Sequence, residues 1–401
     1  MPDHPAADPE AFRAEARAWL AANFPASLKG RGGVMMAEGG LPSEPDIRAW
    51  TRAMADKGWG VPTWPRAYGG GGLAPAQAKV LQQEMSAAGA WSPIGGMGVM
   101  MLGPTLLEYG AEAQKQRHIP PIARGEARWC QGFSEPGAGS DLASLQTRCE
   151  DAGDHWLVNG QKIWTSGAQW ADWCFCLVRT DQARKHEGIS FLLIDMRSGG
   201  VETRPIRLIS GNSPFCETFF TDVKVPKDNL VGPLGGGWTI AKRLLQHERG
   251  GLAGAGRGGL TAEPVSDLAK GYLDLDDAGR IADSDLRARI AGHEMDLMAF
   301  QLTAARSMRE SRSNSGPSAA TSIMKNAGAR VAQDRAELTL EIMGNQGLGW
   351  EGEGFTRDEL AAVRGWLGGK AFSIYGGSAE VQDSIIAKRI LGLPDPLGQS
   401  R

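Results

Sequence analysis

Two stretches of the chain carry residue types suited to a flat aromatic ligand with polar edges. Residues 133–144 read FSEPGAGSDLAS, and residues 160–173 read GQKIWTSGAQWADW. The first is a loop of small residues, and the second is unusually dense in tryptophan, serine and threonine. Tryptophan supplies area against which a ring can lie, while hydroxyls and exposed backbone amides bond the heteroatoms of the ring. Together the two stretches predict a binding surface for such a ligand.

Glu248 is the candidate acid–base group. The helix predicted from residue 238 has an apolar stripe, and spacing of three and four places Glu248 on it. The stripe consists of Ala241, Leu244, Leu245 and Leu252. Removal from water disfavours a charged carboxylate and raises its pKa toward neutrality, as a proton-abstracting base needs. On the pattern alone, a salt bridge to a buried arginine or a position near the surface end of the helix is the alternative interpretation.

The elements that must position these residues fall into three blocks. Apolar spacing is helical from about residue 10 to 125, where Pro and Gly clusters at 62–75 and 93–104 are expected to separate the helices. Residues 126–236 are rich in β-branched and aromatic runs bounded by turn residues, and helical spacing returns from 238 to 391. The strands expected there include His155–Val158, Trp173–Arg179, Gly188–Asp195 and Glu217–Val225. The pattern predicts an α+β chain with a helical domain at 1–125, a β-domain at 126–237 and a helical domain at 238–401.

Composition excludes several classes of function. The 401 residues are 42% apolar and 22% charged, as in a soluble globular protein. A net charge of -3 without a dense Lys/Arg run gives no reason to expect nucleic acid or an acidic membrane as partner. The longest apolar stretch, Ile189–Met196, is too short to cross a bilayer, and no secretory signal is visible at the start of the sequence. A cytoplasmic location is the default expectation.

The sequence contains no recognisable motif for a metal site, a disulfide framework or a nucleotide-binding loop. Five cysteines in a chain of this size indicate small buried residues, and six scattered histidines make a zinc or other metal site improbable. No GxSxG or Walker string occurs. Gly254, Gly256 and Gly259 have the spacing of a dinucleotide fingerprint, but they follow a predicted helix and lack the βαβ context. This glycine run either packs tightly on a neighbour or opens room beyond Glu248 for a wide ligand.

The two opening stretches resemble the flavin-binding motifs of the acyl-CoA dehydrogenase family. Residues 14–25 (AEARAWLAANFP), 58–73 (GWGVPTWPRAYGGGGL) and 374–394 (IYGGSAEVQDSIIAKRILGLP) resemble further family segments in the family order. The resemblance implies an N-terminal helical domain, a central β-barrel or sandwich domain and a C-terminal helical bundle. It also implies FAD as cofactor and a role in the catabolism of fatty acids or other lipids.

The resemblance assigns the catalytic base. Many members carry a glutamate in a tyrosine, glutamate, glycine string of the closing segment, but this chain has Tyr375, Gly376 and Gly377 there. A second group carries the base on the helix after the β-domain, immediately before an arginine, and Glu248 with Arg249 matches that pattern. Gly376 fits the relocation, because a second carboxylate in the site would raise like-charge repulsion. Arg249 would contact or position the substrate, although a solvent-exposed helix arginine has the same pattern.

The same resemblance assigns the remaining site residues. For the flavin ring it implies Gln131, Phe133, Ser134, Trp164, Thr165 and Ser166. For the dinucleotide part it implies Ser378 and Glu380, together with Gly344 and Gly347 of a glycine-bearing turn that approaches the cofactor of the partner subunit. Ser140 would lie toward coenzyme A and Met97 near the acyl pocket, where ordinary core filling explains the methionine as well. An arginine-led cofactor string typical of many members is not legible between residues 258 and 278.

The implied reaction is dehydrogenation of an acyl-CoA to the 2-enoyl-CoA, with electrons passing to an electron-transfer flavoprotein. The implied assembly is a homodimer or homotetramer, or a heteromer with a paralogue. Two other functions stay open: a non-catalytic or half-catalytic subunit of a heteromeric enzyme, and a flavin oxidase or monooxygenase on the same fold. The sequence does not indicate the length, branching or ring content of the acyl group.

Overall fold

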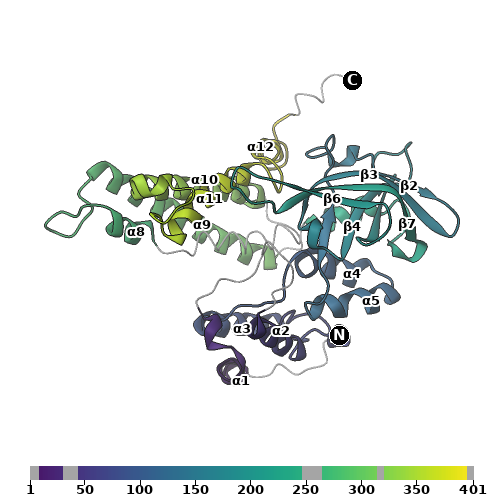
Figure 1. The fold of residues 1–401 in the computed structure, drawn as a ribbon, viewed down its shortest axis with the longest axis horizontal. Coiled ribbons are helices and arrows are strands. Elements are labelled where there is room, and N and C mark those ends of the chain that lie inside the picture. Colours follow the sequence, from purple (N-terminus) through teal and green to yellow (C-terminus); the bar gives the residue numbers. More distant parts are fainter. Residues whose placement is uncertain (1–8, 30–43, 246–263, 314–319, 395–401) are drawn as a thin grey trace. The chain divides into compact units, whose positions relative to one another are not determined.

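The computed structural model describes residues 9–29, 44–245, 264–313 and 320–394 (Figure 1). The chain divides into two compact units. Unit 1 comprises Met1–Ile206 with Ser213–Glu248, and unit 2 comprises Arg207–Asn212 with Arg249–Arg401. Along the chain, helices precede the strands and helices follow them, so the predicted order of an N-terminal helical, a middle β and a C-terminal helical part is confirmed.

Three helices at the start of unit 1 pack around tryptophans. They are α1 (Pro9–Asn23), α2 (Pro45–Asp56) and α3 (Pro75–Ala87). The Trp19 ring lies 5.5 Å from Trp50 and 4.8 Å from Trp59, between ring centroids. Each of α2 and α3 has proline at its first turn, where a missing N–H costs no hydrogen bond. The buried Glu84 of α3 binds two arginines of α1, so a charged contact reinforces this apolar packing.

One expected loop is helical instead. The Pro/Gly cluster at 93–104 was expected to separate helices, but its second half forms a π-helical turn at Gly98–Leu102 that continues into α4 (Gly103–Tyr109). A β-carbon added at Gly103 would lie 2.0 Å from the Trp64 ring, so glycine is needed there for close approach and not for a turn. Pro104 falls in the first turn of α4, where proline is tolerated. The helix α5 (Glu112–Ala123) follows.

The β-domain is one twisted sheet of eight strands. They are β1 (Trp129–Gly132), β2 (Arg148–Asp151), β3 (His155–Ser166), β4 (Trp173–Arg179), β5 (Ile189–Asp195), β6 (Val201–Ile206), β7 (Phe215–Pro226) and β8 (Leu230–Val231). The order is β6-β7-β3-β2-β4-β5-β8, and β1 pairs with β4 in parallel. The four segments named from the sequence correspond to β3, β4, β5 and β7, with only Gly188 left outside a strand, because their β-branched and aromatic runs suit a buried pleated surface.

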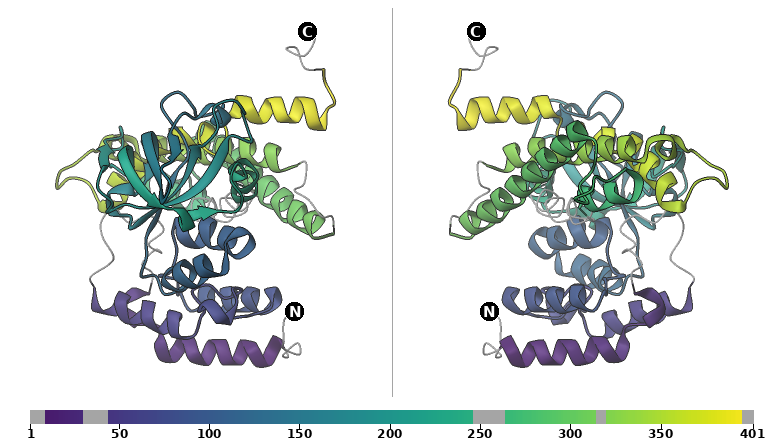
Figure 2. Two further views of the ribbon diagram at one scale, coloured as in Figure 1. Left: turned by 90° about the vertical axis from the view of Figure 1, so that its right-hand side faces the viewer. Right: turned by 90° about the vertical axis from the view of Figure 1, so that its left-hand side faces the viewer.

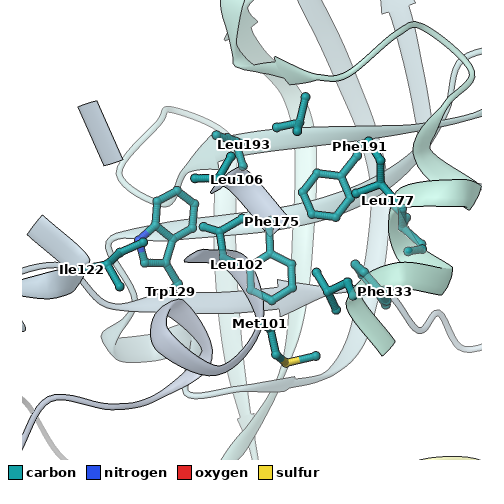
Figure 3. Close-up of a cluster of buried hydrophobic side chains, with 14 of the residues drawn as sticks. Met101, Leu102, Leu106, Ile122, Trp129, Phe133, Phe175, Leu177, Phe191 and Leu193 are labelled. Atoms are coloured by element: carbon teal, nitrogen blue, oxygen red, sulfur yellow. The ribbon is translucent and has the colours of Figure 1, made fainter. Parts of the chain in front are cut away.

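Both faces of β4 are buried. Phe175 and Leu177 point into a core shared with Leu102 and Leu106 at the end of the π-helical turn and in α4, as Figure 3 shows. Cys174 and Cys176 alternate with them and lie in a second core, which contains all five cysteines of the chain. These cysteines are buried and free, which confirms their interpretation as small core residues. Burial raises the pKa of the Cys149 thiol to about 12.

Unit 2 is built around one central helix, α10 (Ala320–Met343), which contacts most of the other helices of the unit (Figure 2). These are α8 (Val265–Tyr272), α9 (Ser284–Ser313), α11 (Arg357–Gly369) and α12 (Ala379–Ile385). Leu338 and Ile342 of α10 pack with Leu286 and Ile290 of α9 and with Val265 of α8. In the part of the chain that the structure describes, no helix is both long and apolar enough to cross a membrane.

Candidate active site

The two stretches singled out in the sequence lie against each other in unit 1. The loop after β1 runs beside the end of β3, where the backbone N–H of Ile163 donates to the carbonyl of Ser134 at 2.9 Å. The Lys162 ammonium donates to the carbonyl of Phe133 at 3.2 Å and to Glu135 Oε1 at 2.7 Å. The residues predicted for the flavin ring in unit 1 are therefore brought together by backbone and side-chain bonds of this chain.

Trp164 stands out by its backbone. Its φ of 60° lies in the left-handed region, which bulky residues rarely adopt. The pairing of β3 with β7 shifts register between Lys162 and Thr165, so Trp164 sits in a bulge. Bulges re-aim a side chain, and here Trp164 is left 53% exposed between the partly exposed Ile163 and the buried Thr165. A large aromatic side chain that is both strained and exposed indicates a ligand surface.

Lys162 and Glu135 form a buried ion pair beneath this surface. Lys162 is fully buried and Glu135 is 8% exposed. Burial alone would raise the pKa of Glu135, but the Lys162 charge and hydrogen bonds from Lys162, Thr147 and Gln146 outweigh it and hold that pKa below its usual range. The backbone N–H groups of Gln146 and Thr147 donate to the Glu135 carboxylate at 2.6 and 2.9 Å. The pair therefore links the loop after β1, the segment 146–147 and β3 into one rigid support.

The other predicted ring residues differ in exposure. Phe133 is 5% exposed, and its ring meets Phe175 edge to face at 5.9 Å between centroids, so its side chain belongs to the core. Thr165 is fully buried, and its hydroxyl has no partner among the described residues. Neither of these two side chains is therefore accessible at the surface. Gln131, Ser134 and Ser166 are partly exposed, and with Trp164 they supply the accessible side chains.

Ser140 and Met97 were predicted on the substrate side. Ser140 is exposed in the loop that leads into the short turn Leu142–Ser144. The buried Arg179 of β4 fixes this turn, because its guanidinium donates to the carbonyls of Ala143 at 2.6 Å and Leu145 at 3.2 Å. A hollow of about 520 Å³ opens beside the same loop, between Gly137, Gln146 and Gln161. Met97 is partly buried against the core of Figure 3, which fits its interpretation as core filling.

The closing segment of unit 2 holds Ser378 and Glu380 at the start of α12. The Ser378 hydroxyl caps the helix by accepting from the N–H of Val381. A hydrogen bond from Ser378 lowers the pKa of Glu380, and the nearby charge of Lys325 contributes to the lowering. Burial lowers the pKa of Lys325, whose Nζ is buried without a hydrogen-bond partner among the described residues. The start of α12 therefore carries the Ser378 hydroxyl and the Glu380 carboxylate, with the Lys325 ammonium nearby.

Gly376 and Gly377 precede this cap in left-handed backbone, with φ of 67° and 91°. Glycine adopts this conformation without strain, whereas a glutamate at position 376 would be strained. A β-carbon at Gly377 would also lie 2.5 Å from Gln382 Nε2. The local backbone therefore favours glycine at the position where many family members carry their base.

Gly344 and Gly347 lie at the other end of α10. They belong to the turn Gly344–Leu348, and a β-carbon at Gly347 would approach the Leu340 carbonyl to 2.5 Å. The start of α12 instead adjoins the beginning of α10, where Asn326 Nδ2 donates to Asp383 Oδ1 at 2.8 Å. With a rise of about 1.5 Å per residue, α10 separates the two groups by roughly 27 Å. The structure therefore does not bring all four predicted dinucleotide contacts together within one chain.

The predicted base lies outside the described residues. The helix at 237–245 is described, and Ala241 and Leu244 of its predicted apolar stripe are almost fully buried. Glu248 and Arg249 follow beyond its described end, as does the glycine run at 250–259. Their roles remain predictions.

Four polar residues of the candidate site escaped the sequence analysis: Glu135, Lys162, Arg179 and Lys325. For Lys162 a signal existed, since it follows Trp156 and Val158 at even spacing on the inward face of a strand. A lysine at an inward position requires an acidic partner, but the sequence does not say that Glu135 is that partner. Arg179 and Lys325 depend on tertiary contacts that no local pattern reports.

Comparison with known proteins identifies the family. Three family models match in order: the N-terminal domain of acyl-CoA dehydrogenase at residues 7–126, the middle domain at 130–223 and the C-terminal domain at 235–391. The acyl-CoA dehydrogenase IpdE1 of Mycobacterium tuberculosis is 37% identical over 398 residues, covering 96% of this chain and 98% of the relative. The chain belongs to the acyl-CoA dehydrogenase family, whose enzymes depend on FAD.

Two solved structures with similar folds each name two proteins in their titles, and one of the titles describes a complex. The Tcur3481-Tcur3483 steroid ACAD matches with a TM-score of 0.77 and 31% identity over 98% of this chain and 99% of that one. The ChsE4-ChsE5 complex from M. tuberculosis matches with a TM-score of 0.75 and 30% identity over 98% of this chain and 100% of that one.

Proposed function

We propose that this chain binds FAD and dehydrogenates an acyl-CoA thioester between its α and β carbons, with Glu248 as the base. The single observation that carries the proposal is the exposed, strained Trp164. It lies beside the loop 133–135, which is hydrogen-bonded to β3, in a chain that belongs to this family. Bound FAD would accept the β-hydrogen as hydride, and an electron-transfer flavoprotein would take up the electrons.

The residues of unit 1 fit a flat ring with polar edges. The half-exposed Trp164 indole offers apolar area, and the hydroxyls of Ser134 and Ser166 have no hydrogen-bond partners among the described residues. The ion pair of Lys162 and Glu135 holds the backbone of the same loop rigid, so the Ser134 and Phe133 amides stay in place. Preorganised donors of this kind bind a ligand without a further cost of ordering.

The residues of unit 2 support sharing of the cofactor between subunits. Ser378 and Glu380 lie at one end of α10, and Gly344 and Gly347 lie at the other. Because roughly 27 Å of helix separates them, we infer that the two groups contact different cofactors in the assembled enzyme. Each cofactor would then meet Ser378 and Glu380 of one chain and the glycine turn of another.

The proton is removed by Glu248 in this proposal. Its place on the stripe of Ala241 and Leu244, both almost fully buried, supports a desolvated carboxylate of raised basicity. Arg249 would position the thioester. Gly376, in left-handed backbone, leaves the alternative base position empty.

Substitution of the base provides the test. We expect Glu248→Gln to bind FAD with an unchanged absorbance spectrum, while anaerobic reduction by acyl-CoA slows by about 10²–10⁴, the usual contribution of a general base. Glu202→Gln, the same change at an exposed position of the edge strand β6, should leave the reduction rate unchanged. Equal reduction rates in Glu248→Gln and the unsubstituted protein would place the base elsewhere.

For the acyl group, we infer a bulky, ring-bearing chain. Two observations support this: the glycine run beyond Glu248 reduces side-chain bulk, and one structural relative is titled a steroid ACAD. Bleaching of the flavin by a panel of straight, branched and ring-bearing acyl-CoAs measures the preference. Faster bleaching by a straight short chain would contradict it.

A second function has specific support. Gly376 lacks a carboxylate, the arginine-led cofactor string is not legible, and the titles of two structural relatives each name two proteins. These features suit a subunit that completes the site of a paralogue. Purification of the chain alone distinguishes the two functions. A yellow protein whose colour is bleached by acyl-CoA in the absence of oxygen supports the dehydrogenase. A colourless protein supports the accessory subunit. Rapid reoxidation in air with release of peroxide would instead indicate an oxidase.

A further inference from the structure

Two buried cations hold the two ends of the loop that follows β1. At the end nearest β1, Lys162 pairs with Glu135 beneath the surface proposed for the flavin ring. At the far end, Arg179 of β4 donates to the turn Leu142–Ser144. Ser140, which was predicted to lie toward coenzyme A, precedes this turn by two residues. The two ends of one loop are therefore fixed by different side chains and lie near different predicted ligands.

Arg179 directs its hydrogen bonds to two loops. It is 5% exposed, and within the described residues its four side-chain hydrogen bonds end on backbone carbonyls instead of a carboxylate. Two of these carbonyls, at Ala143 and Leu145, belong to the loop after β1, and two, at Arg184 and Lys185, belong to the loop between β4 and β5. A buried charge is normally held by an opposite charge. An arginine that bridges two stretches of loop backbone instead is suited to fixing their conformation.

The loop between β4 and β5 is itself anchored to the helix at 237–245. The His186 ring stacks on Trp238, with 5.0 Å between the ring centroids. At the end of the same loop, the Ser190 hydroxyl accepts from the backbone N–H of Gly235 at 2.9 Å, just before the helix begins. The arginine therefore ties the loop after β1 to a second loop that is fixed on this helix.

The part of the loop between the two cations leaves its backbone open. Gly137 and Gly139 do not have left-handed backbone, and β-carbons added there would meet nothing within 4 Å. Neither conformation nor packing among the described residues therefore requires glycine at these two positions. Small residues at such places let a ligand approach the backbone amides closely. Ser140, directly beyond them, is exposed.

We propose that Arg179 is a positioning residue for the thioester: it holds the loop around Ser140 in the conformation that binds the coenzyme A end of the substrate. Lys162 holds the flavin end of the same loop. The inference rests on the proposed function and adds this division of the loop to it. Because a loop that must be ordered on binding lowers affinity, loss of Arg179 should weaken binding of the thioester and leave binding of FAD unchanged.

The affinity for coenzyme A itself tests this positioning in the protein as purified. Arg179→Lys keeps the charge, but a single ammonium on a shorter side chain cannot reproduce the fork of donors that reaches both loops. We expect the dissociation constant for coenzyme A, measured by calorimetry, to rise about tenfold. The KM for acyl-CoA should rise with it, whereas the limiting rate of anaerobic flavin reduction and the dissociation constant for FAD should stay unchanged.

Chemical rescue separates positioning from a loss of stability. In Arg179→Ala, guanidinium ion at a concentration that does not denature the protein should restore the affinity for coenzyme A, because the free cation can occupy the vacated place. Asn229→Ala is the matched control, since Asn229 is buried and donates to the backbone carbonyl of Leu193 at 2.8 Å. It should destabilise the protein without changing the affinity for coenzyme A, with or without guanidinium. If Arg179→Ala does not fold, the measurement on Arg179→Lys still decides.

Two results would overturn the inference. One is an unchanged dissociation constant for coenzyme A in Arg179→Lys, and the other is an unsubstituted protein that does not bind coenzyme A. Equal losses of affinity for coenzyme A and FAD would likewise contradict the division of the loop. The proposed function fails by a different result, namely a protein that binds coenzyme A but whose flavin no acyl-CoA reduces, and the effect of Arg179→Lys on coenzyme A affinity is measurable in that case as well.

Discussion

At the scale of single residues, Trp164 combines strain with exposure. Its φ of 60° costs about 1–3 kcal/mol, and the indole gains little packing in return because half of it is open. We expect Trp164→Gly to leave the thermal midpoint of the protein without cofactor nearly unchanged or higher, since glycine accepts this backbone. The dissociation constant for FAD should rise about tenfold or more, because the ring surface is lost.

The control for this change is Trp164→Phe, which retains an aromatic face in the same strained backbone. It should lose less FAD affinity than Trp164→Gly, as followed by flavin fluorescence during titration. An unchanged FAD affinity in Trp164→Gly would remove the indole from the cofactor site.

Residue types at the site could be predicted from the sequence, but their orientation could not. The resemblance selected Phe133 and Thr165 together with Trp164, yet the first two side chains are buried and only the third is exposed. The difference depends on the bulge between Lys162 and Thr165, which changes the alternation of the strand. A bulge is a property of the pairing with β7 and leaves no signal in β3 alone.

At the scale of elements, two glycines that both lie in helices have different roles. Gly103 begins α4 with its α-carbon against Trp64, whereas Gly365 in α11 has no neighbour within 4 Å of an added β-carbon. We expect Gly103→Ala to destabilise the protein by about 1–3 kcal/mol, because the buried Trp64 ring cannot move aside. Gly365→Ala should be neutral or stabilising by about 0.4–1 kcal/mol. Free energies of unfolding in urea measure both, and equal effects would contradict the packing explanation.

Strands and long helices could be predicted because their periodicity is local. The helical turn at 98–102 could not, since glycine and proline usually end helices and only the contact with Trp64 and Trp129 explains their use there. The separation of Ser378 from Gly347 could not be predicted from the sequence either. It depends on the packing of these two segments at opposite ends of α10.

At the scale of the whole molecule, one buried histidine makes stability depend on pH. His118 packs edge to face against Trp129 and Trp173, and burial lowers its pKa to about 4. Between pH 6.5 and 4 the unfolded chain binds a proton that the folded protein does not, so stability falls as the pH falls. The difference between the ordinary histidine pKa of 6.5 and about 4 corresponds to about 3 kcal/mol.

His118→Phe removes this proton and keeps an aromatic ring between the two tryptophans. We expect the loss of unfolding free energy between pH 7 and 4.5 to be smaller in this variant by roughly 2 kcal/mol. Carboxylates titrate in the same range in both proteins, so the difference between them isolates the histidine. Parallel curves would show that His118 takes up its proton in the folded state as well.

The five buried cysteines make the opening of the sheet measurable by chemical labelling. Thiols in β1, β2, β4 and β7 are shielded from water, and the thiolates that react with alkylating reagents form only when these strands part. Labelling rates of the native protein, resolved by mass spectrometry of each peptide, would therefore measure how often each strand opens. No engineered probe would be needed to learn whether cofactor or substrate closes the β-domain.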